Sequence, residues 1–237
     1  VSEAYGSIDA ELRRLDAGMI SGILRLRSIP SFLGKWLTPR LPRLQQRYPD
    51  IQLRLVAEDS SVALHEGDFD LAIDLNDGSY PGLLSTALLD EQIFPVCAPS
   101  LLRGRPPLHG PADLGHFALL HDITAWRGSY EYAEWEFYLN AIGFDGADVR
   151  RGHTFNRNHL TIEAAIAGIG VAIARRTLLN DELERGTLIV PFGLPIANHK
   201  RYVLLYPAGA LAHPSARAVH DWLVEEAQSF RALHGSA

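Results

Sequence analysis

The stretch 22–41 constrains the fold most strongly, because its apolar residues change their spacing once. Leu24 and Leu26 alternate with arginines, and a spacing of two is typical of a strand. The next apolar side chains recur at spacings that predict one face of a helix: Phe32, Leu33, Trp36, Leu37 and Leu41. A strand that leads at once into a helix is a building unit of α/β folds.

Ser28, Pro30 and Ser31 lie at the point where the spacing changes. Proline suits the first turn of a helix, and serine is a good N-cap. The free N–H groups at a helix start also bind anions. Two interpretations stay open here: the serines only cap the helix, or they contact a ligand.

Further predicted strands alternate with predicted helices along the chain. The strands are expected at 51–56, 69–74, 86–97, 117–121, 152–155, 170–174, 187–191 and 201–206, and the helices at 60–66, 130–142, from about 158, at 177–183 and from about 215. This alternation favours parallel βαβ units. Ligands of such sheets bind beyond the carboxyl ends of the strands, so the loops of interest are 28–32, 58–61 and 75–79.

The helix from about Ser215 has the cleanest helical period and needs a sheet to cover. We therefore expect the chain to return to its first lobe, so that two crossovers join two lobes with a cleft between them. Lobe I is predicted to comprise 20–85 and 202–237, and lobe II 86–201. Residues 1–19 look like the end of a linker helix.

Composition and charge narrow the class of protein. The chain has 237 residues, of which 47% are hydrophobic, and a net charge of −6, whereas a free-standing nucleic-acid binder more often has a basic face. No apolar run reaches the roughly 18 residues of a membrane span. The single cysteine, Cys97, excludes an internal disulfide and favours a reducing compartment. These features predict a cytoplasmic protein without a membrane segment.

The familiar catalytic and metal-binding motifs are missing from the sequence. His153 and His159 are near neighbours, but no third ligand has metal-site spacing. Gly168 and Gly170 form a lone G-x-G that predicts a tight turn rather than a dinucleotide loop. We therefore expect no metal, no cofactor and no enzymatic activity.

Two predicted helix starts, near Ser31 and Asn158, would face one cleft. Each start contributes roughly 0.3–1 kcal/mol toward a charged ligand group, and up to about 2 kcal/mol when partly buried. This predicts a small carboxylate-bearing ligand. Four aromatic side chains, His121, Trp126, Phe155 and Tyr202, are either walls of the cleft or core residues.

Four sequence strings occur in an order that resembles the effector-binding domain of LysR-type transcriptional regulators. They are SIPSFLGKWLTPRLPRLQQRYPDIQLRL, GDFDLAIDLNDGSYPGL, LLDEQIFPVCAPSLL and AAIAGIGVAIARRTLLNDELERGTLIVPF. The resemblance covers roughly residues 20–232. The string FPVCAPSLL and the pattern of Trp135, Tyr138, Leu139 and Gly143 point to the subgroup of the glycine-cleavage activator and the β-lactamase regulator.

The resemblance implies a periplasmic-binding-protein-like fold of type II, in which two Rossmann-like lobes hold the effector between them. It implies that the winged helix-turn-helix is absent from this chain, so that DNA is contacted only through that missing domain. It also implies a homodimer or homotetramer, with antiparallel pairing through helices at about 33–47 and 160–169.

The resemblance also assigns effector-binding positions at the helix starts, the second loop and the returning strand. The residues assigned in this way are Ser31, Ser60, Ser61, Asn156, Asn158, His159 and Tyr202. Ser28 and Phe32 from the loop 28–32, and His121 from the possible cleft walls, complete the predicted effector-binding set. Beside them, Glu58 and Asp59 favour an amine or amino-acid-like effector, unless these carboxylates point away. The sequence therefore predicts a ligand-sensing regulatory domain. The alternative is a solute-binding protein of a transport system, which shares the fold.

Overall fold

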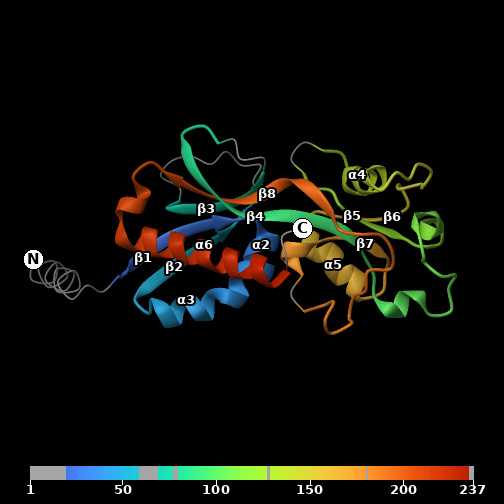
Figure 1. Ribbon diagram of the computed structural model, residues 1–237, viewed down its shortest axis with the longest axis horizontal. Coiled ribbons are helices and arrows are strands. Elements are labelled where there is room, and N and C mark those ends of the chain that lie inside the picture. The colour runs from blue at the N-terminus through green and yellow to red at the C-terminus, as the bar shows by residue number, and fades with distance from the viewer. Residues whose placement is uncertain (1–19, 59–68, 77–79, 127–128, 180, 235–237) are drawn as a thin grey trace, which may run out of the picture. The chain divides into compact units, whose positions relative to one another are not determined.

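The computed structural model describes residues 20–58, 69–76, 80–126, 129–179 and 181–234. The chain divides into two compact units: unit 1 comprises Val1–Ile29, Leu37–Leu89 and Arg201–Ala237, and unit 2 comprises Pro30–Trp36 and Asp90–Lys200. The short segment Pro30–Trp36 therefore packs with unit 2, although both of its flanks in sequence belong to unit 1 (Figure 1).

Unit 1 contains a mixed sheet. Its strands are β1 (Gly22–Ser28), β2 (Ile51–Ala57), β3 (Leu71–Asn76) and parts of β4 (Leu83–Val96) and β8 (Ile196–Pro207). The order is β2-β1-β3-β8, with β1 parallel to both neighbours and β8 antiparallel to β3. Ser28 lies opposite Ala57 and Ile73, so it ends β1 at the edge where parallel strands present ligand-binding loops.

The helix expected after β1 forms, but it is irregular. Its pieces are α2 (Pro30–Phe32), a π-helical turn (Leu33–Leu37), a 3-10 turn (Thr38–Arg40) and α3 (Leu41–Arg47). Pro39 and Pro42 lack the N–H donor of a regular α-helix, which explains why its hydrogen-bond pattern changes here. The expected apolar face is confirmed, since Phe32, Trp36 and Leu37 are fully buried.

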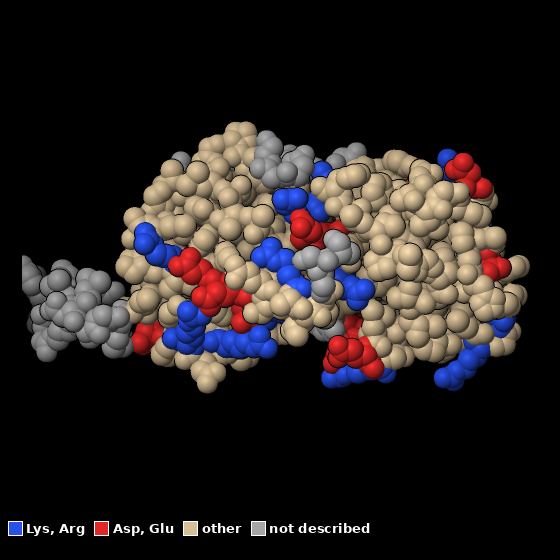
Figure 2. Space-filling view, viewed as in Figure 1, with Lys and Arg blue, Asp and Glu red and all other residues tan. Residues whose placement is uncertain are grey.

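The last helix, α6 (Pro214–His234), belongs to unit 1, as the sequence predicts. Trp222, Leu223 and Phe230 lie on its buried face. Its exposed side is tied to α3 by ion pairs, including one of 2.9 Å between Arg43 Nη1 and Glu226 Oε2. Figure 2 shows these opposite charges mixed over α3 and α6.

Unit 2 has a sheet in the order β4-β7-β5-β6. Its other strands are β5 (Leu119–Asp122), β6 (Gly152–Phe155) and β7 (Val171–Arg175), and its α-helices are α4 (Ala133–Ala141) and α5 (Asn158–Ile166). Strand β5 is parallel to β6 and β7, whereas β4 is antiparallel to β7. The predicted strands and helices at these places are confirmed.

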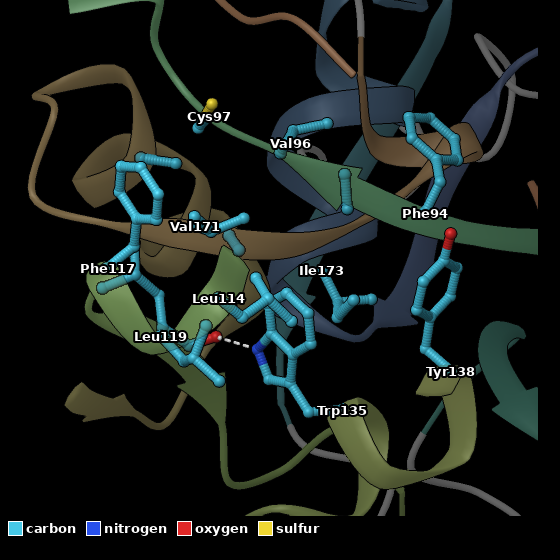
Figure 3. Close-up of a cluster of buried hydrophobic side chains, with 14 of the residues drawn as sticks. Phe94, Val96, Cys97, Leu114, Phe117, Leu119, Trp135, Tyr138, Val171 and Ile173 are labelled. Atoms are coloured by element: carbon cyan, nitrogen blue, oxygen red, sulfur yellow. Dashed lines mark hydrogen bonds between the residues drawn. The ribbon is translucent and has the colours of Figure 1, made fainter. Parts of the chain in front are cut away.

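A large apolar core fills unit 2 (Figure 3). Trp135, Tyr138 and Leu139 form the buried side of α4, as expected. The indole Nε1 of Trp135 donates a hydrogen bond of 3.1 Å to the carbonyl of Leu120, so α4 is fixed to β5 by a directed bond as well as by packing.

Two expected elements are wrong. The strand expected at 187–191 is reduced to one bridge between Cys97 and Ile189, because turns flank this short segment. The helix expected at 177–183 is only a 3-10 turn at Arg176–Leu178, where the backbone N–H of Thr177 bonds to the Glu91 carboxylate at 3.2 Å.

Two further predictions, the helix at 60–66 and the linker end at 1–19, lie outside the described residues. Among the residues that the structure does describe, no helix is both long and apolar enough to cross a membrane.

Candidate functional site

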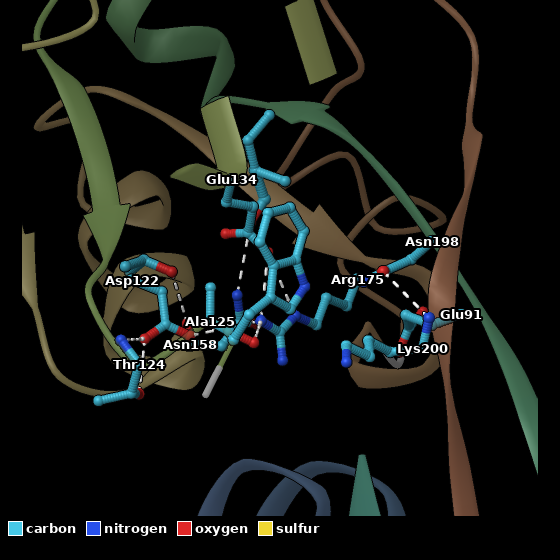
Figure 4. A network of polar contacts seen from close by, with 12 residues as sticks. Glu91, Asp122, Thr124, Ala125, Glu134, Asn158, Arg175, Asn198 and Lys200 are labelled. Carbon is cyan, nitrogen blue, oxygen red and sulfur yellow. Dashed lines mark hydrogen bonds and ion pairs between the residues drawn. The ribbon is translucent and has the colours of Figure 1, made fainter. Parts of the chain in front are cut away.

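Polar side chains meet in unit 2 at the carboxyl ends of its parallel strands (Figure 4). Asp122 ends β5, Arg175 ends β7, and Asn156 follows β6. Asn158 is the first residue of α5. This is the edge at which the parallel-sheet rule places ligands.

A buried arginine organises this edge. Arg175 is 4% exposed, and its guanidinium donates hydrogen bonds of 3.2 and 3.3 Å to Glu134 Oε1 and one of 3.0 Å to the Ala125 carbonyl. Asp122 Oδ2 lies 3.7 Å from Arg175 Nη2. One cation therefore holds two buried carboxylates, as Figure 4 shows. Burial raises the pKa of Glu134 to about 7, although the Arg175 charge acts in the opposite direction.

Asp122 also fixes the loop that follows β5. Its Oδ1 accepts a bond of 2.9 Å from the Thr124 backbone N–H, and the Thr124 hydroxyl lies 2.8 Å away. The same hydroxyl lies 3.0 Å from the carbonyl of Asn156. The loops after β5 and β6 are thus held together just before α5 begins.

Ser31 contacts the start of α5. Its Oγ lies 3.1 Å from His159 Nδ1 and accepts the His159 backbone N–H at 3.4 Å. One turn later, Lys35 Nζ pairs with Glu163 at 3.0 Å and with Glu182 at 3.3 Å. These bonds anchor the segment Pro30–Trp36 on α5, and so bring together two predicted site residues 128 positions apart.

The electrostatics around His159 favour the neutral imidazole near pH 7. Burial lowers its pKa below the ordinary value, and the cations Lys35 and Arg157 lower it further, while Glu163 and Asp122 oppose them. His159 is therefore an uncharged hydrogen-bonding group of the site near pH 7, and not a fixed cation.

Asn158 is 2% exposed and has one unused polar atom. Its Nδ2 lies 3.5 Å from the Ile173 carbonyl. Its Oδ1 has no hydrogen-bond partner among the described residues. A buried acceptor without a donor is unfavourable, so this oxygen marks a position for a donor group.

Three predicted residues are core-like where the structure places them. Phe32 is fully buried and stacks on Trp36, with ring centroids 4.8 Å apart. His121 is 2% exposed and packs edge-on against Tyr132. Tyr202 is fully buried in β8. Of the two interpretations that the sequence leaves open for His121 and Tyr202, burial favours the core.

Ser28, in unit 1, is 1% exposed, and its hydroxyl donates to the Ile29 carbonyl at 3.4 Å. The neighbouring Glu58 forms an ion pair with Arg27, which is 7% exposed. The charge of Glu58 is therefore compensated, and it no longer argues for an amine ligand. Asn156 is exposed, whereas Ser60, Ser61 and Asp59 lie outside the described residues.

Sequence reasoning missed the residues that organise the site: Lys35, Asp122, Glu134 and Arg175. One local signal existed, because Arg175 is the single charge at the end of the apolar strand VAIAR. A lone arginine there must find buried partners. Its partner Glu134 is 41 residues away, and no local pattern indicates it.

The structure gives less support to a metal site or to a ligand site elsewhere in unit 2. In the part of the chain that the structure describes, no three His, Cys, Asp or Glu side chains are grouped to hold a metal ion. A groove of about 460 Å³ lies beside β6 and is lined by Gly152, His153, Thr154, Phe155 and Ile169. None of these five is in the predicted effector-binding set, although Phe155 is one of the four aromatic residues predicted as possible cleft walls.

Comparison with known proteins gives a consistent family. Residues 17–228 match the model of the LysR substrate binding domain. The glycine cleavage system transcriptional activator of Escherichia coli K12 is 31% identical over 227 residues, which are 96% of this chain and 72% of the relative. The transcriptional activator AmpR of Pseudomonas aeruginosa is 28% identical over 227 residues, 95% of this chain and 73% of the relative.

Comparison with solved structures indicates the same family. The effector domain of AmpR from Pseudomonas aeruginosa has a TM-score of 0.75 at 27% identity and covers 90% of this chain and 100% of its own. This similarity confirms the expected α/β fold of the periplasmic-binding-protein-like type. The relatives are transcriptional regulators, so neither an enzyme nor the transport alternative is favoured. The chain belongs to the LysR substrate-binding domain family, as the effector-binding domain of a LysR-type transcriptional regulator.

Proposed function

We propose that this domain senses a small carboxylate-bearing effector through Ser31, Asn158 and His159. The observation that carries the proposal is the Ser31 hydroxyl held 3.1 Å from His159 Nδ1 at the start of α5. A helix start attracts anions, and a serine hydroxyl is a good donor to a carboxylate. Arg157 adds positive charge beside His159, whereas the charge of Lys35 is compensated by Glu163 and Glu182.

The expected affinity is moderate. The helix start contributes roughly 0.3–1 kcal/mol, and up to about 2 kcal/mol when partly buried. Charge-assisted hydrogen bonds add more. A dissociation constant between about 1 μM and 1 mM, or roughly −8 to −4 kcal/mol, is therefore consistent with this site.

In this proposal Arg175 stabilises the loops around the site without contacting the effector. It holds Asp122 and Glu134, and Asp122 holds the Thr124 loop against the carbonyl of Asn156. Arg175 would thus position the loops that flank α5 rather than touch the effector.

The remaining predicted contacts rest on the family resemblance or, for Ser28, Phe32 and His121, on the sequence pattern alone. They are Ser28, Phe32, Ser60, Ser61, His121, Asn156 and Tyr202. The predicted lobes, 20–85 with 202–237 and 86–201, likewise stay a proposal.

The relatives named as transcriptional activators suggest how sensing is used. We propose that effector binding changes the promoter contacts of a DNA-binding domain elsewhere in the full-length protein, in the cytoplasm. We also propose a homodimer or homotetramer that pairs through 33–47 and 160–169. Light scattering at tens of micromolar tests this, and a monomer would count against it.

A ligand screen tests the effector site. Thermal shift with amino acids, small organic acids and peptidoglycan fragments should give a stabilising hit, because a ligand that binds only the folded state raises its stability. Calorimetric titration of that hit should show weaker binding in Ser31→Ala and in Asn158→Ala. Ser100→Ala is the control, since Ser100 is an exposed serine of the same unit. Equal binding to all three variants would contradict the proposed site.

A further inference from the structure

We propose that carboxylate binding at this site is coupled to the uptake of one proton by His159, with Ser31 changing from donor to acceptor toward the imidazole. This inference rests on the proposed function and adds to it both a proton and a further chemical feature of the ligand. It follows from the number of protons available in the Ser31–His159 contact.

The contact uses up the serine hydroxyl when the neutral imidazole carries its proton on Nε2, and we assign this tautomer to the free site. Ser31 Oγ already accepts the His159 backbone N–H, and it lies 3.1 Å from Nδ1. A hydroxyl has one proton, and an unprotonated Nδ1 is an acceptor. In the Nε2–H tautomer, Ser31 therefore donates its only proton to Nδ1, and none is left for a ligand.

Protonation reverses the direction of this bond. When Nδ1 takes up a proton from the solvent, it becomes the donor and Ser31 Oγ becomes the acceptor. The hydroxyl proton of Ser31 is then free to point at an incoming carboxylate. No covalent bond is made or broken, and the only species gained besides the ligand is one proton.

The charged groups around His159 allow a bound ligand to favour its protonation. The cations that face it are Lys35 and Arg157, and the carboxylates are Glu163 and Asp122. Glu163 is paired with Lys35, and Asp122 accepts the backbone N–H of Thr124. A ligand carboxylate would add a negative charge beside the ring, which raises the pKa of His159 from its lowered free value.

Asn158 adds the second chemical feature. Its Oδ1 is buried and lacks a donor among the described residues, and it lies on the residue before His159. A carboxylate alone cannot satisfy an acceptor. The ligand class that fits is therefore a small acid with an O–H or N–H donor close to its carboxylate.

Glycolate, acetate and glycolamide are matched probes of this inference. Glycolate has both a carboxylate and a hydroxyl, acetate lacks the hydroxyl, and glycolamide lacks the charge. Nitrogen-15 NMR of the imidazoles should show the Nε2–H tautomer of His159 at neutral pH. Saturating glycolate should move its titration midpoint upward, whereas glycolamide should not.

Binding should show the same linkage. Between the free and bound midpoints of His159, glycolate affinity should rise by up to about tenfold for each unit by which the pH falls. His159→Gln should lose this pH dependence, and Ser31→Thr should retain it because threonine keeps the hydroxyl. His153→Gln is the control and should behave like the wild type, since His153 is an exposed histidine on β6.

The outcomes separate the inference from the proposed function. If glycolate shifts the amides of 31 and 158–160 while the His159 midpoint stays fixed, the proton coupling is refuted and the site stands. Acetate binding as tightly as glycolate would refute the role of Asn158. If neither acid perturbs these amides at its highest soluble concentration, the inference fails, and the screen with Ser31→Ala decides the proposed function separately.

Discussion

Replacing Arg175 by methionine should destabilise unit 2 by about 3 kcal/mol at pH 8. The side chain is 4% exposed, and its removal leaves the carboxylates of Glu134 and Asp122, 6% and 3% exposed, without their cation. Removing one partner of a buried ion pair typically costs about 3–5 kcal/mol. The lower end applies here because Asp122 keeps its bond from the backbone N–H of Thr124.

The free energy of unfolding that Arg175→Met loses should become smaller as the pH falls. The folded-state pKa of Glu134 is raised to about 7 by burial, above its unfolded value, so this group favours the folded state at low pH and loses that contribution as the pH rises. Without Arg175 its folded pKa rises further, and the added loss appears mainly above pH 7. At pH 6 the variant can hold Glu134 protonated and neutral.

Urea unfolding, followed by circular dichroism and tryptophan fluorescence, measures the free energy of unfolding of the wild type and the variant at pH 6 and at pH 8. The double variant Glu134→Gln, Arg175→Met should recover part of the loss at pH 8. Arg176→Met is the matched control: Arg176 lies over the Phe94 ring at 4.7 Å, and its loss should be no more than about 2 kcal/mol. Equal losses for Arg175→Met at both pH values, or a loss no larger than the control's, would refute this reasoning.

Three further predictions concern stability, reactivity and response. Gly152→Ala should destabilise the protein by more than about 2 kcal/mol in urea, because φ is +129° and a Cβ would lie 1.8 Å from the Leu119 carbonyl oxygen. Gly34→Ala should instead stabilise it by roughly 0.5–1 kcal/mol, because beyond its own helical turn a Cβ there would meet no described atom within 4 Å. Burial raises the pKa of Cys97 to about 11, so its thiol should react with DTNB at pH 8 only as fast as the protein unfolds; an immediate reaction would contradict its burial. Ser31→Ala should lower the free energy of unfolding by only about 1 kcal/mol while it weakens effector response. A melting temperature many degrees lower with unchanged binding would make Ser31 a structural cap.

Local sequence patterns predict the regular elements well where period and burial agree. Strand β1 and helix α6 follow this rule, since each has one apolar face that its unit buries. The patterns fail where a tertiary contact decides the backbone. The Glu91 carboxylate takes the N–H of Thr177, and a single bridge to Cys97 replaces the strand expected around Ile189.

The candidate site was predictable where its residues have local sequence signals, and not where tertiary contacts bring them together. The helix starts at Ser31 and Asn158 have local signals in serine, proline and asparagine. That both starts face one cleft was expected from the alternation of strands and helices, whereas the direct contact of Ser31 with His159, 128 positions away, has no local signal. The ion pair of Arg175 with Glu134 has no such signal, because it depends on how α4 packs on the sheet.

The position of the bound effector tests the proposed site most directly. We predict that a crystal structure with the tightest ligand of the thermal-shift screen places its carboxylate within hydrogen-bonding distance of Ser31 Oγ, at the first turn of α5, with a ligand donor on Asn158 Oδ1. A ligand bound in the groove beside β6, with no contact to Ser31, Asn158 or His159, would contradict it.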